Sequence, residues 1–159
     1  MSFESTRSDV SSALSISLDQ WEPLSYDKDA WIGGGMRNVV DRVSFAVGAE
    51  SVKRVVGEGH AELQDNRETW AGNFFVFTES RFVVVDKPIG NAASVTVYPR
   101  SRITSLSVES ANINVDSGSI IGLKFQATYP EASVTFVSRG KADAPELAEF
   151  LESLLADLS

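Results

Sequence analysis

The chain has 159 residues, no cysteine and one histidine, and its 22 acidic and 14 basic residues give a net charge of −8. This composition, 43% hydrophobic and 23% charged, is typical of a single soluble globular domain. The lack of cysteine excludes disulfides, thiolate metal sites and a cysteine nucleophile, and one histidine excludes a two-histidine metal site. An acidic chain without a basic cluster is poorly suited to nucleic acid, so we expect none to bind.

The first 50 residues are predicted to lie outside the main domain. Residues 1–17 are rich in serine and weakly apolar, which predicts a mobile arm. Residues 18–50 form an N-terminal extension, in which Trp21 and Trp31 stand among acidic residues. Both tryptophans are candidate interaction residues, with core packing as the alternative role.

The end of this extension is predicted to be an amphipathic helix over residues 35–47, because its apolar residues recur with helical spacing. These residues are Met36, Val39, Val40, Val43 and Val47. No segment has the charged start and apolar run of a secretory signal, and no apolar window is long enough for a membrane helix. We therefore expect a cytoplasmic location.

From residue 51 the apolar period changes to two, and turn residues interrupt the pattern every 8–12 residues, which is typical of antiparallel strands. Seven strands are predicted, near residues 52–63, 70–78, 81–87, 94–98, 103–109, 119–129 and 132–139. Residues 111–118 are predicted to be a solvated loop.

The chain ends in a second predicted amphipathic helix, whose apolar stripe should cover a hydrophobic surface. The stripe consists of Leu147, Phe150, Leu151, Leu154, Leu155 and Leu158. Asp143 is the expected N-cap, with Glu146 three positions later as in a capping box, and Pro145 falls in the first turn.

Seven antiparallel strands followed by one amphipathic helix resemble the pleckstrin-homology fold, and residues 51–158 are most similar to bacterial pleckstrin-homology-like domains. Two stretches carry the similarity: residues 77–86 (FTESRFVVVD), with a threonine and a tight turn with arginine between apolar strands, and residues 98–106 (YPRSRITSL). The resemblance implies a mainly β fold over residues 51–159. It would be a seven-stranded antiparallel barrel or sandwich, capped by the C-terminal helix.

The resemblance also places phosphoinositide binding in the loop between the first two strands, where several basic residues would hold phosphates. Residues 63–69 contain Arg67 alone, beside Asp65 and Glu68, and one arginine does not make a phosphate clamp. Membrane contact is therefore expected to be peripheral at most.

Arg100 and Arg102, with Lys87, are the nearest approach to a basic cluster, because residues two apart on a strand share a face. Arg100 and Arg102 are therefore candidate interaction residues, as is Arg67. For the Arg100 and Arg102 cluster, the alternative is a solvated strand edge or an intramolecular pairing with the acidic N-terminal arm. The single histidine, His60, is interpreted as structural. No catalytic, cofactor or metal-binding motif is found, so no enzyme activity is expected.

The sequence favours a non-enzymatic protein-interaction or self-assembly module, in which strand edges or a sheet face bind a protein or a second copy. The alternatives are a β-barrel carrier of a small ligand or lipid, which needs a cavity of about 300–1,000 Å³, or a weak membrane adaptor.

Overall fold

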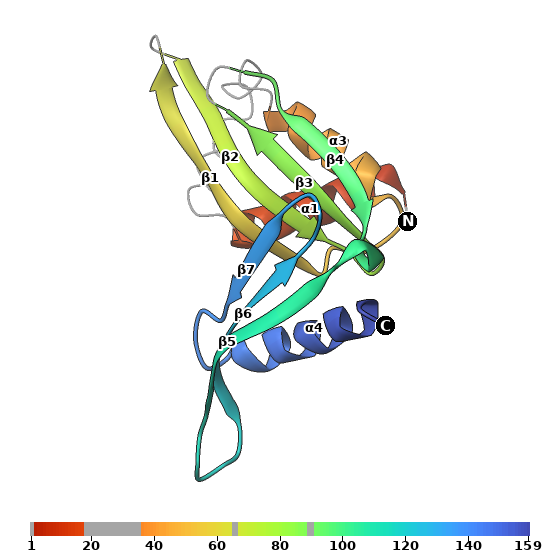
Figure 1. Cartoon of the computed structure of the whole chain (residues 1–159). Helices are drawn as coiled ribbons and strands as arrows, with labels where there is room; N and C mark the ends of the chain where they lie inside the picture. Colours follow the sequence, from red (N-terminus) through yellow and green to blue (C-terminus); the bar gives the residue numbers. More distant parts are fainter. Residues whose placement is uncertain (1, 18–35, 65–66, 89–90) are drawn as a thin grey trace. The chain divides into compact units, whose positions relative to one another are not determined.

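The computed structural model describes residues 2–17, 36–64, 67–88 and 91–159. They form two compact units, Met1–Pro99 and Arg100–Ser159. The described chain is mainly β, as the sequence predicts, with seven antiparallel strands, helices near the N-terminus and a C-terminal helix (Figure 1). The described strands are hydrogen-bonded as separate sheets of four and three strands, so they do not close into one barrel.

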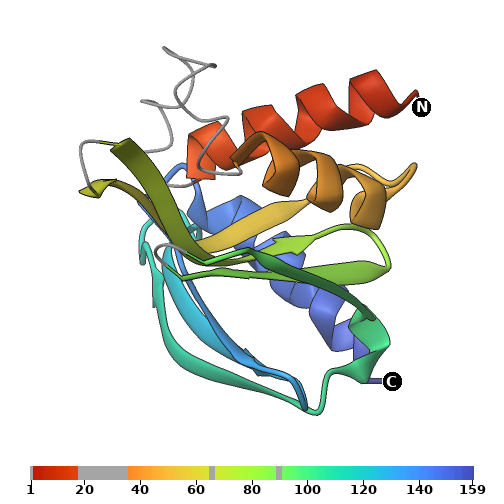
Figure 2. The ribbon, with the colours of Figure 1, turned by 90° about the horizontal axis from the view of Figure 1, so that it is seen from above.

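The first unit is a four-stranded antiparallel sheet with helices over one face. Its elements are α1 (Phe3–Ser17), α3 (Met36–Val47), β1 (Arg54–Gln64), β2 (Arg67–Phe77), β3 (Arg81–Lys87) and β4 (Ser94–Pro99), with the sheet order β1-β2-β3-β4. Figure 2 shows α1 and α3 side by side over this sheet. Val55, Val76 and Val83 stand opposite one another in the ladder and are buried in the core that the sheet shares with the helices.

The predicted helix at residues 35–47 is confirmed as α3. Its valine stripe, Val39, Val40, Val43 and Val47, is buried in the same core as the strands. The sequence predicts a domain boundary before residue 51. This buried core contains residues from both sides of that position, among them Val47 and Val55.

The N-terminal residues, which the sequence predicts to be a mobile arm, form the helix α1 in the structure. Val10 and Leu14, one helical turn apart, are fully buried in the core that contains the α3 valines. Thr6 Oγ1 donates to the Gly48 carbonyl at 3.1 Å, and the Asp9 carboxylate accepts the Val52 N–H at 3.3 Å. A serine-rich segment is a weak helix former alone, but tertiary packing of a few apolar residues is enough to stabilise a helix.

The carboxylate of Glu50 fixes the turn between β2 and β3. It accepts hydrogen bonds from Thr78 Oγ1 at 2.7 Å and from the Ser80 backbone N–H at 3.1 Å and hydroxyl at 2.7 Å. These bonds, with that of Thr78 the largest contribution, lower the pKa of Glu50. Arg81 donates to the Val47 carbonyl at 2.9 Å, so this turn is tied to both the end of α3 and the residues after it.

The second unit is a three-stranded antiparallel sheet with one long helix packed on it. Its elements are η1 (Arg100–Arg102), β5 (Ser105–Ile113), β6 (Ile120–Thr128), β7 (Ser133–Val137) and α4 (Ala144–Asp157), with the sheet order β5-β6-β7. The Phe125 and Phe136 rings stack at 4.8 Å, and Phe136 lies 5.4 Å from Phe150 of α4. Leu147 and Leu154 are fully buried, which confirms that the amphipathic helix covers an apolar surface.

The ends of the second unit's elements differ in two places from the sequence prediction. Pro145 does lie in the first turn of α4, but Asp143 makes no side-chain cap bond, and its carboxylate accepts the Arg139 N–H at 3.0 Å. The predicted capping box is therefore not formed. β5 continues to Ile113 and β6 begins at Ile120, so the connection between them covers residues 114–119 instead of the predicted 111–118.

Candidate functional site

β5 is the least protected edge of the two sheets. The edge strands are β1 and β4 in the first sheet and β5 and β7 in the second. Edges expose backbone groups that can pair with another strand, and proteins protect them with charges, proline or short length. β1 carries several charged residues, β4 ends in Pro99, and β7 has five residues. β5 has nine residues, one charged side chain and no proline.

The side chains of β5 are also open, with only Leu106 partly covered. Val108 is 55% exposed although it stands opposite Phe125, which is fully buried. Two apolar rows cross the sheet in register: Val134–Ala127–Leu106 and Phe136–Phe125–Val108. Both rows are buried on β7 and β6, and both end at the open edge of β5.

The other face of β5 is polar and begins with Ser105 and Ser107. A register shift between Val108 and Ser110 leaves Glu109 outside the ladder with β6, and its carboxylate lies 3.1 Å from the ammonium of Lys124. A bulge of this kind bends a strand and interrupts further pairing. The regular part of the edge is therefore the short segment from Ser105 to Val108.

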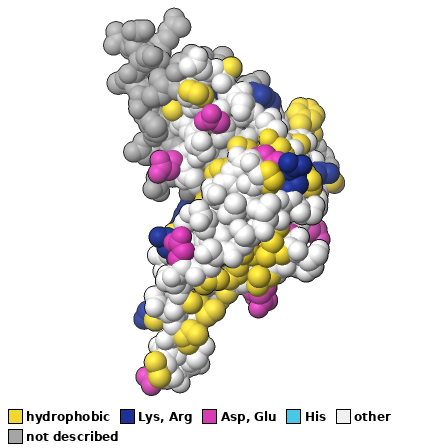
Figure 3. All heavy atoms as spheres, in the orientation of Figure 1, with side chains coloured by type: hydrophobic (Ala, Val, Ile, Leu, Met, Phe, Trp, Pro, Cys, Tyr) yellow, Lys and Arg dark blue, Asp and Glu magenta, His cyan; other side chains and the backbone are white. Residues whose placement is uncertain are grey.

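Beyond this bulge, β5 and β6 continue as a hairpin past the end of β7, which pairs with Lys124–Thr128. Asn114 Oδ1 accepts the Asp116 N–H at 2.9 Å, and Gly118, with φ of 71°, takes the left-handed conformation that the turn requires. This ordered turn presents Val115, which is 96% exposed. Figure 3 shows hydrophobic side chains gathered over α4 and this hairpin.

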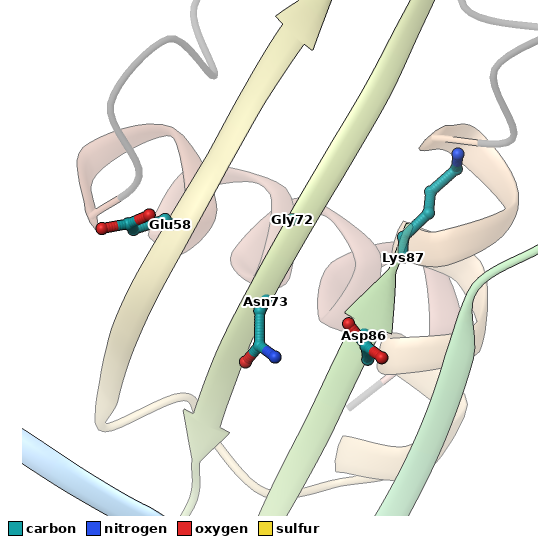
Figure 4. Close-up of a pocket in the computed structure, with 5 residues that line it drawn as sticks. All are labelled: Glu58, Gly72, Asn73, Asp86 and Lys87. Atoms are coloured by element: carbon teal, nitrogen blue, oxygen red, sulfur yellow. The ribbon is translucent and has the colours of Figure 1, made fainter. Parts of the chain in front are cut away.

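A polar hollow of about 450 Å³ lies on the first sheet (Figure 4), lined by Glu58, Gly72, Asn73, Asp86 and Lys87. Glu58, Asn73 and Asp86 stand opposite one another on three neighbouring strands, so their exposed side chains share a face. Lys87 points away from them in Figure 4, and burial lowers the pKa of its ammonium. This exposed polar lining differs from the enclosed apolar cavity that suits a lipid carrier.

Arg100, a predicted interaction residue, is buried within the second unit, where it is 4% exposed. Its Nε lies 2.8 Å from the Asp157 carboxylate, and its Nη2 donates to the Ser153 hydroxyl at 2.9 Å. The guanidinium also lies over the Phe150 ring, 5.3 Å from its centroid. Arg100 therefore joins η1 to α4 and is not presented to a partner.

Tyr129 is also buried, and the charges of Arg100 and Asp157 act on the pKa of its hydroxyl. Burial raises the pKa of its hydroxyl and outweighs the opposing effect of the arginine. The phenol therefore stays protonated at neutral pH and contributes to packing in the second unit.

Arg102 forms an ion pair with Glu131, and its side chain is partly exposed. Both arginines lie in the short helix η1 rather than on one face of a strand, and both have acidic partners within their own unit. These partners, Asp157 of α4 and Glu131, are not residues of the acidic N-terminal arm that the sequence alternative names. Arg67 begins β2, but its side chain is outside the described part, as are Trp21 and Trp31.

Two absences concern residues 2–17, 36–64, 67–88 and 91–159, which the structure describes. No group of three or more histidine, aspartate or glutamate side chains in those ranges is arranged to hold a metal ion. None of the helices there combines the length and apolar character needed to cross a membrane.

The open edge of β5 is the feature that the sequence interpretation missed. The alternation of Ser105, Leu106, Ser107 and Val108 predicts a strand, but periodicity does not tell which strands lie beside it. The usable signal is the lack of charge and proline between residues 103 and 108, because an edge strand normally carries such protection.

The comparisons with known proteins find similarity among solved structures. No family model matches the chain, and no curated protein matches it. Among solved structures, the chain is similar to the crystal structure of a DUF1696 family protein with a pleckstrin-homology domain from Shewanella loihica PV-4. The two are 16% identical, and the match covers 64% of this chain and 95% of that chain, with a TM-score of 0.33.

The fold follows from the elements of this chain itself. Four antiparallel strands are followed by three more and then by an amphipathic helix. This is the order that the sequence resemblance to the pleckstrin-homology fold implies, and the structure confirms it.

Proposed function

We propose that the chain is a non-enzymatic protein-interaction module that binds an extended protein segment along the open edge of β5. The observation that supports this function is the pair of apolar rows that remain open at Leu106 and Val108. An added strand would satisfy the outer backbone groups of β5 and would cover both side chains.

The two faces of β5 define the chemistry of the bound segment. Side chains directly opposite one another on neighbouring strands point to the same face, so residues facing Leu106 and Val108 should be aliphatic. The residue between them lies on the polar face, opposite Ser107. The module therefore selects a segment that alternates apolar and polar residues, and it needs no cofactor.

Site-specific photo-crosslinking in cells tests this function. A photoreactive amino acid replaces Val108 in the full chain, and the matched control places it at Val137, which is 54% exposed at the other edge of the same sheet. Cells are irradiated, and the covalent products are identified by mass spectrometry. We expect protein adducts from position 108 well above those from position 137. Equal adduct yields from the two positions would contradict the proposed function.

A second variant checks that the adducts come from strand pairing. Ser107→Pro removes a backbone N–H and restricts the chain in the middle of the regular edge, while the side chain it replaces is exposed. Combined with the crosslinker at position 108, it should reduce the adducts, provided that circular dichroism shows a folded chain. Undiminished adducts from a folded Ser107→Pro chain would show that position 108 is reached without strand pairing.

A further inference from the structure

We infer that the segment bound by β5 is the β5 strand of a second copy of this chain, paired antiparallel about a twofold axis beside Ser107. This inference rests on the proposed function and names its partner. The reason is that the regular part of β5, Ser105–Val108, is complementary to itself in one register.

In that register Ser107 faces the partner's Ser107, which puts Leu106 opposite the partner's Val108. The twofold axis makes the reverse contact at the same time, with Val108 opposite the partner's Leu106. Directly opposite residues share a face, so the apolar rows of one sheet continue into those of the other. The serines meet on the polar face, where two hydroxyls can hydrogen-bond.

Registers shifted toward Glu109 lack this complementarity. With the axis at Val108, Leu106 would face the partner's Ser110. With the axis at Glu109, two carboxylates would face each other, which is unfavourable. In the Ser107 register, Glu109 faces the partner's Ser105. Its carboxylate keeps the ion pair with Lys124 of the same copy, at 3.1 Å.

The bulge at Glu109 limits the pairing to a few residues. A short interface of this kind is expected to be weak and concentration-dependent. The net charge of −8 on each copy opposes association, whereas the paired segment carries almost no charge. Raising the ionic strength should therefore strengthen self-association, because salt screens the repulsion between copies.

Disulfide trapping tests the register. The chain has no cysteine, so Ser107→Cys introduces a single exposed thiol. The matched control is Ser133→Cys, an exposed serine on the edge strand β7. Because residue 107 faces itself across the axis, Ser107→Cys should oxidise to a covalent dimer at least about tenfold faster than Ser133→Cys. Equal rates at the same concentration would overturn the inference.

Charge substitution tests whether residue 107 meets itself. Ser107→Lys or Ser107→Asp places like charges opposite each other, so each variant alone should lose the dimer in sedimentation velocity at a concentration where the unaltered chain dimerises. An equimolar mixture of the two variants should regain it. A mixture that stays monomeric, or single variants that dimerise like the unaltered chain, would overturn the pairing.

The crosslinking experiment at Val108 separates the failure of this inference from the failure of the proposed function. Adducts between two copies of the chain support both. Adducts at position 108 to a different protein, together with no disulfide dimer of Ser107→Cys, support the proposed function and overturn the second copy as its partner. Adduct yields no higher than those at position 137 contradict both.

Discussion

The two sheets cover their apolar faces alike but differ at their edges. The four-stranded sheet packs against α1 and α3, and the three-stranded sheet packs against α4. The first sheet carries charges on β1 and a proline at the end of β4, whereas β5 of the second sheet has neither protection along Ser105–Val108. A helix can cover the apolar face of a sheet and still leave an edge strand exposed, and here the exposed edge of β5 is where binding is expected.

The largest effect that tests this comparison is expected in the core of the second sheet. Phe150 is nearly buried and packs against Phe136 and beneath Arg100. Phe150→Ala should lower the free energy of unfolding by about 3–5 kcal/mol, measured by urea denaturation. Hydrogen exchange should show the loss of protection in β6 and β7.

The control for this change is Leu155→Ala on the same helix, where the side chain is 49% exposed. It should change the free energy of unfolding by less than about 0.5 kcal/mol. Similar losses from both variants would show that α4 does not cover its sheet through Phe150.

A smaller effect is expected in the first sheet, at a strand that its neighbour approaches closely. Gly57 in β1 has φ of 133°, and an added Cβ would collide with the backbone of Asn73 and Phe74 on β2. Gly57→Ala should therefore lower the free energy of unfolding by about 1–3 kcal/mol. Gly140→Ala is the control, because a Cβ there meets nothing within 4 Å. Equal stabilities of the two variants in urea would contradict this reading of β1.

The smallest effect concerns pH and the turn that Glu50 holds. Its pKa is lower in the folded chain than its ordinary value of 4.5, so the carboxylate contributes stability above pH 4.5. That contribution is lost as the pH falls through the folded pKa. Glu50→Gln should therefore flatten the dependence of the melting temperature on pH over this range. Glu79→Gln, in the same turn, is the control and should leave the dependence unchanged.

The elements that sequence predicts well are those with local signals. The valine stripe of α3, the leucine-rich stripe of α4 and the alternation in β6 each define an apolar face without reference to the rest of the chain. The helix α1 lacks such a local signal, because Val10 and Leu14 are buried in a core that includes the valines of α3. Helix propensity alone does not report that partnership.

The candidate site is less predictable for a related reason. Leu106 and Val108 are recognisable as strand residues, but their exposure depends on β5 lying at the end of its sheet rather than in the middle. Arg100 shows the opposite error: an arginine that sequence places on a surface is buried by Asp157, Ser153 and Phe150, all more than 45 residues away in the chain. The exposure of Leu106 and Val108 and the burial of Arg100 both depend on contacts between residues far apart in the chain. The periodicity of the sequence carries no information about such contacts.

The packing of α1 has a practical consequence for anyone who shortens the chain. A version that begins after α1 would lose Val10 and Leu14 and leave the valines of α3 less covered. Such a fragment should be prone to precipitate during purification. Recombinant work on the β5 edge should therefore retain the N-terminal helix. Nonspecific association caused by the truncation is then not mistaken for binding of a partner.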